Sequence, residues 1–157
     1  MKKTFPGHLT QQQFLQRHWQ KKPLLIRNAF PAFRDLLERD QLFDLACRDD
    51  LQSRLIVQKR GAWKVFHGPF TARDFRGLPA SKWSLLVQGI NHILPQAQRL
   101  LLLFNFIPYA RLDDLMISYA PPGGGVGAHF DSYDVFLLQG SGRRLWQIST
   151  QKDLQLM

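Results

Sequence analysis

A cluster of glycines is the feature that most constrains how this chain can fold. Four glycines fall within residues 123–127, shortly before His129 and Asp131. Glycine permits backbone conformations and close approaches that a Cβ atom would forbid. We therefore predict a tight loop over residues 123–127 that leads into a strand carrying the two polar residues.

The spacing of His129 and Asp131 indicates a metal site. Side chains alternate between the two faces of a strand, so these two would point the same way, with Phe130 on the other face. One imidazole and one carboxylate are two of the three ligands of the facial triad that holds Fe(II). Pairs of this kind are common by chance, so the residues alone leave an ordinary polar strand end as the alternative.

A second predicted strand adds a cation to this picture. After a tight turn at residues 139–142, alternation would place Arg144, Trp146 and Ile148 on one face. An arginine in a mostly apolar cavity needs a partner, and its planar guanidinium suits a carboxylate. The dicarboxylate 2-oxoglutarate could chelate iron at one end and meet Arg144 at the other. The alternative is that Arg144 extends its head group to solvent at a barrel rim.

The rest of the chain alternates between helical and extended patterns. Thr10 and Gln13 form a capping-box pattern that predicts a helix over residues 11–20. Further helices are expected to begin at Asp40 and at Ser84. Strands are expected over residues 23–26, 54–58, 63–66, 112–119, 133–139 and 143–148. We therefore predict an α+β chain in which helices and strands lead into an antiparallel β region.

Composition limits the class of protein. With 157 residues, of which 45% are hydrophobic, the chain can bury one ordinary core. The longest apolar run, residues 100–104, is far shorter than the roughly 18 residues of a membrane span. The single cysteine, Cys47, excludes an internal disulfide and is expected to be buried. We predict a soluble, cytoplasmic protein with no membrane partner.

The net charge of +9 is distributed unevenly. Basic residues number 12 against 6 acidic ones over residues 1–60, 5 against 1 over residues 61–110, and 4 against 5 over residues 111–157. The excess is spread over several predicted elements. A solvated basic surface is therefore favoured over a dedicated nucleic-acid patch, and nucleic acid is a less favoured partner.

Longer motifs resemble a known family. The run from His129 to Trp146, which includes Tyr133-Asp134 and Gly142-Arg143-Arg144, is similar to the cupin-type JmjC oxygenases, specifically the bacterial ribosomal oxygenases. Similar runs occur over residues 14–23, 53–55, 67–70, 83–88, 91–92 and 113–118. The resemblance implies a partial double-stranded β-helix, the cupin/JmjC jelly roll. Residues 1–110 would form the N-terminal α+β part, and residues 111–157 the first strands of the barrel.

The resemblance also implies an activity. It is that of an Fe(II)- and 2-oxoglutarate-dependent dioxygenase that hydroxylates the β-carbon of an arginine in the sixteenth large-subunit ribosomal protein. The implied site residues are His129 and Asp131 for Fe(II), Arg144 and Ser118 for 2-oxoglutarate, and Tyr133 and Asp134 for the substrate arginine. A solvated turn is the alternative role for the last two.

The sequence departs from the family in one important respect. The family's third iron ligand is a second histidine several strands after the first, but only 28 residues follow His129 and none is histidine. The four earlier histidines, at positions 8, 18, 67 and 92, are better explained by packing or surface positions. The second half of the barrel, the dimerisation helices and the winged-helix-like domain are not found either. We therefore expect a C-terminally truncated chain without the family's homodimer interface.

Three interpretations follow from this departure. The chain could be a shortened arginine hydroxylase that is inactive alone. It could instead be a non-catalytic basic module that binds ribosomal protein or RNA. The third interpretation is a split enzyme whose remaining half is a separate polypeptide.

Overall fold

The computed structural model describes residues 6–7 and 9–149, and the chain divides into two compact units. One unit combines Met1–Asp35 with Phe130–Met157, and the other is Leu36–His129. These units reflect backbone packing, so the division expected at residue 110 stays a prediction. No helix in the described part of the chain is long and apolar enough to cross a membrane.

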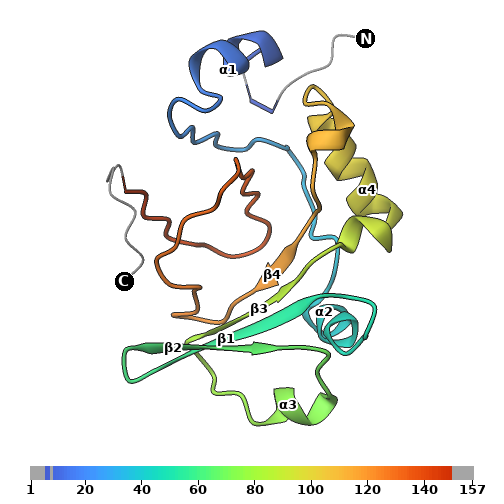
Figure 1. Ribbon diagram of the computed structural model, residues 1–157, viewed down its shortest axis with the longest axis vertical. Coiled ribbons are helices and arrows are strands. Elements are labelled where there is room, and N and C mark those ends of the chain that lie inside the picture. Colours follow the sequence, from blue (N-terminus) through green and yellow to red (C-terminus); the bar gives the residue numbers. More distant parts are fainter. Residues whose placement is uncertain (1–5, 8, 150–157) are drawn as a thin grey trace. The chain divides into compact units, whose positions relative to one another are not determined.

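A four-stranded antiparallel sheet forms the centre of the Leu36–His129 unit (Figure 1). Its strands are β1 (Ser53–Lys59), β2 (Ala62–His67), β3 (Trp83–Val87) and β4 (Ile117–Tyr119). Their order across the sheet is β2-β1-β3-β4. The predicted hairpin is confirmed, because β1 pairs with β2 around a turn in which Arg60 and Gly61 both have positive φ. The α+β class is confirmed as well.

Strand β3 corrects the helix expected from Ser84. All five of its residues are buried, and it pairs with β1 on one side and β4 on the other. A central strand that is covered on both faces has a continuous apolar sequence instead of an alternating one. Such a run cannot be distinguished from a buried helix by periodicity alone, which is why the sequence interpretation was wrong.

One face of the sheet packs against helices to form the core. Leu55, Leu85 and Val87 belong to this buried cluster together with Leu42 and Ala46. The last two lie on α2 (Arg39–Ala46), whose first turn is capped by Glu38 N–H donating to Gln41 Oε1 at 2.8 Å. The helix therefore begins before Asp40. Cys47, which follows α2, is exposed, so the expectation that it is buried is wrong.

Short helices complete this unit. They are α3 (Ala72–Arg76), α4 (Pro95–Leu101) and the 3-10 turns Ile90–His92, Leu102–Phe104 and Tyr109–Arg111. In α3 the Asp74 carboxylate accepts hydrogen bonds from Thr71 N at 2.7 Å and from Thr71 Oγ1 at 2.8 Å. These bonds hold the first turn, and they also affect the acidity of Asp74.

We expect the stability that Asp74 contributes to depend on pH. The hydrogen bonds from the Thr71 backbone and hydroxyl lower the pKa of Asp74 below the usual 3.8. Its contribution should therefore be fully present above that value and be lost as the pH falls through the lower pKa of the folded state. Denaturation of wild type and Asp74→Asn can be compared at pH values from 7 to 2. The free energies of unfolding of the two proteins should differ at pH 7, and this difference should disappear at the acid end. A difference that is constant with pH would contradict this.

The other unit contains the capping box predicted at the N-terminal end of the chain. Thr10 Oγ1 accepts from Gln13 N at 3.1 Å, and Gln13 Oε1 accepts from Thr10 N at 2.9 Å. The helix α1 (Gln11–Arg17) is three residues shorter than expected. Its Phe14 ring lies 5.9 Å from the Phe136 ring, centroid to centroid. The strand expected over residues 23–26 does not form, and Leu25 is 75% exposed.

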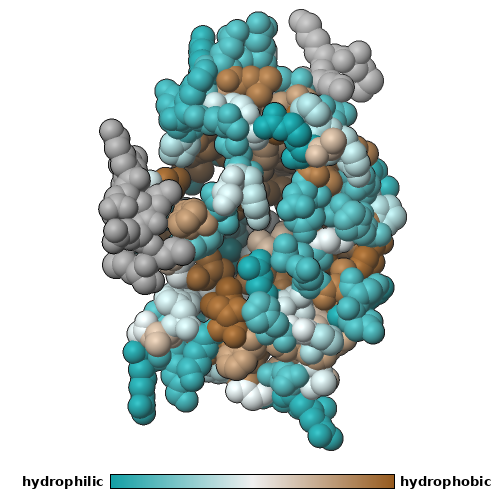
Figure 2. All heavy atoms as spheres, viewed as in Figure 1, coloured by the Kyte–Doolittle hydropathy of each residue, from teal (hydrophilic) through white to brown (hydrophobic). Residues whose placement is uncertain are grey.

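The strands expected over residues 133–139 and 143–148 do not form either. Within the described residues, no strand occurs after Tyr119. A strand satisfies its backbone groups by pairing with a neighbour, and no ladder to these residues forms in the described part of the chain. Many of their apolar side chains are exposed, among them Leu137 and Leu145. Figure 2 shows separate apolar patches within a largely hydrophilic surface on the viewed face.

Candidate functional site

The glycine loop is bound to the beginning of β3, within the Leu36–His129 unit. Lys82 N donates to Pro122 O at 3.0 Å, and Gly124 N donates to Pro121 O at 2.9 Å to close a turn. A Cβ atom on Gly124 would lie 2.1 Å from the Trp83 carbonyl oxygen. The predicted close approach of backbone is therefore confirmed at Gly124.

The next part of the loop packs on the indole of Trp63 in β2. A Cβ atom on Gly127 would lie 3.2 Å from Trp63 Nε1, and one on Gly125 would lie 3.3 Å from Trp63 Cη2. Gly127 also has φ +80, which side chains with a Cβ atom rarely adopt. The indole and the conformation together explain why glycine is needed at position 127, two residues before His129.

The position of His129 suits a metal ligand in one respect. Its Nδ1 lies 3.1 Å from the Gly127 carbonyl oxygen. A carbonyl oxygen only accepts, so this contact favours the tautomer with a proton on Nδ1 and the lone pair on Nε2. Metal-binding histidines commonly donate their second N–H to a backbone carbonyl in this way. The ring is exposed.

His129 and Asp131 do not lie on a strand, so the alternation argument for a common face does not hold. The boundary between the two compact units passes between them, at residues 129 and 130. Asp131 is exposed and belongs to the unit that also contains Arg144. Their roles as iron ligands stay predictions.

Arg144 and Trp146 lie together although their strand is absent. The guanidinium carbon of Arg144 is 5.8 Å from the centroid of the Trp146 ring, a distance at which a cation and an aromatic face attract each other. Arg144 is half-buried, and Trp146 is 45% exposed. The predicted turn before them contains a bend in which Asp35 Oδ1 accepts from Ser141 N at 3.0 Å.

The two residues predicted to meet the substrate are exposed. Tyr133 has 64% of its surface accessible. Asp134 Oδ2 accepts a hydrogen bond from Gln20 Nε2 at 3.2 Å, which attaches this segment to the chain near α1. Ser118 belongs to the other unit, where it is half-buried on β4 and paired with Leu86 of β3.

The third metal ligand is not found among the described residues. No three His, Cys, Asp or Glu side chains lie close enough there to hold a metal ion. His18 stacks on Phe14 with ring centroids 6.4 Å apart, and His67 is the last residue of β2. His92 lies in the 3-10 turn Ile90–His92, whereas His8 lies outside the described residues. The donor types thus suit iron, but this part of the chain brings no complete ligand set together.

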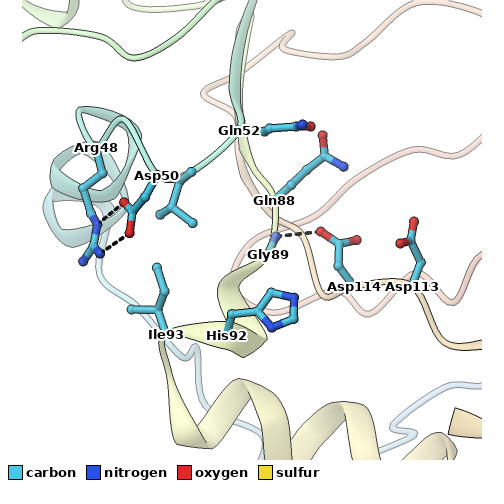
Figure 3. Close-up of a pocket in the computed structure, with 10 residues that line it drawn as sticks. Arg48, Asp50, Gln52, Gln88, Gly89, His92, Ile93, Asp113 and Asp114 are labelled. Atoms are coloured by element: carbon cyan, nitrogen blue, oxygen red, sulfur yellow. Dashed lines mark hydrogen bonds and ion pairs between the residues drawn. The ribbon is translucent and has the colours of Figure 1, made fainter. Parts of the chain in front are cut away.

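Sequence reasoning missed a polar hollow of about 600 Å³ beside the sheet (Figure 3). On the wall of this hollow, Asp114 Oδ2 accepts a hydrogen bond from Gly89 N at 2.6 Å. Arg48 forms two hydrogen bonds with Asp50, at 2.8 and 2.6 Å, and these lower the pKa of Asp50. His92 and Asp113 also line the hollow. These residues come from three separate segments, so only the fold brings them together.

Comparison with known proteins defines the class. Residues 99–157 match the JmjC domain family. The chain is 44% identical over 142 residues to the ribosomal protein uL16 3-hydroxylase of Escherichia coli, covering 90% of this chain and 38% of that protein. It is 46% identical over 144 residues to a probable ribosomal oxygenase of Haemophilus influenzae, covering 91% of this chain and 35% of that protein. The chain thus spans less than two-fifths of the length of these relatives.

Solved structures agree with the sequence relatives. The E. coli ribosomal oxygenase YcfD superposes with a TM-score of 0.76 at 43% identity, over 82% of this chain and 35% of that one. Its complex with cobalt and 2-oxoglutarate gives the same TM-score at 42% identity, over 83% of this chain and 36% of that one. Residues 99–157 thus match the JmjC domain family, and the chain as a whole is similar to the bacterial ribosomal oxygenases. These findings confirm the resemblance seen in the sequence and the cupin-type fold.

Proposed function

We propose that this chain supplies the Fe(II)- and 2-oxoglutarate-binding part of a ribosomal oxygenase that hydroxylates an arginine of the large-subunit protein uL16. The observation that carries the proposal is the His129-x-Asp131 pair after a glycine loop, in a chain 44% identical to a uL16 3-hydroxylase. The relative's complex with cobalt and 2-oxoglutarate supports both cofactor assignments.

Each site residue has a role that matches its chemistry. His129 and Asp131 would hold Fe(II), which supplies the oxidation of the substrate carbon by molecular oxygen. The guanidinium of Arg144 suits the distal carboxylate of 2-oxoglutarate, and the Ser118 hydroxyl could donate to the same molecule. The carboxylate of Asp134 and the phenol of Tyr133 would orient the substrate guanidinium by hydrogen bonding and stacking.

We further propose that this polypeptide is inactive alone. The donors His129 and Asp131 are both exposed, and the described residues contain no group of three His, Cys, Asp or Glu side chains that could hold a metal ion. Two exposed donors hold a divalent ion weakly, because water competes at each of them. Turnover would then need a further ligand from chain outside the described residues or from a second polypeptide.

Cobalt titration of the 157-residue chain tests the metal assignment. We expect weak Co(II) binding by visible absorption, a loss of about tenfold or more in affinity for His129→Ala and for Asp131→Ala, and no change for His92→Ala. Equal affinity in wild type and His129→Ala would contradict the assignment. Succinate production from 2-oxoglutarate by the wild-type chain would contradict inactivity. RNA retention that weakens with salt, without cobalt binding, would favour the basic-module interpretation.

A further inference from the structure

The sheet has a second face, opposite the core, that is polar at its centre. The register places His67, Arg54, Leu86 and Ser118 in one row across all four strands. Directly opposed residues in antiparallel strands project to the same face, so these four side chains share it. No strand position on this face of the described sheet is Asp or Glu. We call it the Arg54 face, after its only Lys or Arg residue.

In the part of the chain that the structure describes, no carboxylate pairs with the Arg54 guanidinium. Its Nε is buried and forms no hydrogen bond with any described residue. Its Nη2 lies 3.9 Å from the thioether sulfur of Met116, which is a weak acceptor. Arg39 and Arg48, in contrast, each pair with a neighbouring aspartate. A guanidinium that is partly removed from water in this way is costly unless an anion meets it.

A second polar group on the same face is also unsatisfied. Ser84 is 1% exposed, and its hydroxyl has no hydrogen-bond partner among the described residues. It lies opposite Ile56, one row along the face from Arg54. Ile56 and Leu86 beside it are each 5% exposed. The face therefore combines a buried hydroxyl and apolar neighbours with a cation that no described carboxylate pairs.

The geometry points to a binding site for the carboxylate of a short dicarboxylic acid, centred on Arg54. The planar guanidinium matches a carboxylate, and the exposed apolar side chain of Met116 beside it matches an aliphatic chain. Charge complementarity supports an anion, because no acidic strand residue competes for Arg54 on this face. This contact would use a different guanidinium from the one proposed at Arg144.

This inference deepens the proposed function, since 2-oxoglutarate and succinate are the dicarboxylates which that function would consume and release. The carboxylate site can be tested without metal, so its failure is distinguishable from failure of the metal assignment. If cobalt binding fails but succinate still binds through Arg54, only the proposed function is overturned.

Calorimetric titration of the full chain with succinate, in buffer containing a chelator, provides the test. We expect saturable binding by wild type, weakened about tenfold or more in Arg54→Met and less in Arg54→Lys, which keeps the charge but not the planar fork. Arg73→Met, on α3 and outside the sheet, is the matched control and should bind like wild type. A parallel titration with 2-oxoglutarate shows which of the two dicarboxylates is preferred.

Several results would overturn the inference. These are equal succinate binding by wild type and Arg54→Met, no binding by wild type, or loss of binding in Arg144→Met but not in Arg54→Met. Inorganic phosphate that competes as well as succinate would show a general oxyanion site instead of a carboxylate site. The melting temperature distinguishes a binding role of Arg54 from a role in holding the fold together. Because Nε has no protein partner among the described residues, Arg54→Met should melt no lower than wild type, and a large decrease would mean that Arg54 serves the fold.

Discussion

Leu85→Ala is expected to lower the free energy of unfolding by about 3 kcal/mol, a large fraction of what a domain of this size usually has. Leu85 is completely buried in the central strand β3 and belongs to the core cluster. Alanine would remove apolar contacts and leave a cavity that rigid neighbouring strands cannot close. Urea denaturation followed by circular dichroism measures the change.

The matched control is Leu102→Ala. Leu102 is 39% exposed and lies in a 3-10 turn, so the same truncation there should cost less than about 1 kcal/mol. Equal losses for the two variants would mean that β3 is not the centre of the core. Retention of the wild-type midpoint by Leu85→Ala would contradict the packing described for the sheet.

Gly124→Ala is expected to disturb both the fold and the metal site. The added methyl would lie 2.1 Å from the Trp83 carbonyl oxygen and 2.9 Å from Ala120 Cβ, so backbone must move. Overpacking of this kind costs roughly 1–3 kcal/mol, and more where backbone atoms collide. Because the loop leads to His129, we also expect Co(II) affinity to fall by about tenfold, as for a supporting contact of a metal ligand.

Gly77→Ala provides the comparison for the loop variant. Gly77 ends α3 with φ −95, and a Cβ atom there would meet nothing within 4 Å. Its stability and cobalt affinity should therefore remain close to wild type. Thermal melting and visible absorption of the cobalt complex measure the two effects. If Gly124→Ala bound cobalt as well as Gly77→Ala does, the loop would not position His129.

Local sequence patterns were sufficient to predict several structural elements. The capping box at Thr10 and Gln13, the β1–β2 hairpin and the close approach of Gly124 to backbone all depend on residues near one another in sequence or on the absence of a Cβ atom. The H-x-D motif and its glycine loop also indicate the resemblance to the ribosomal oxygenases from residue types alone. In each case the residue types themselves limit the backbone or the chemistry.

Elements that depend on distant neighbours were not predictable. Residues 83–87 read as a helix, yet they form β3 because β1 and β4 supply its hydrogen bonds. Residues 133–139 and 143–148 alternate like strands, yet no strand forms there because no ladder pairs with them in the described chain. Strand formation requires a partner, whereas a capping box is satisfied within four residues.

By itself, therefore, the sequence determined the chemistry available to this protein: an imidazole and a carboxylate after a glycine loop, with an arginine downstream. Only the tertiary structure decided which groups lie together without partners. Arg54 and Ser84 are separated by 30 positions, and the β1–β3 register places them on one face. Each has a buried atom without a hydrogen-bond partner among the described residues. The physical reason is that burial and hydrogen-bond satisfaction are properties of the packed sheet, since each depends on strands that are distant in sequence.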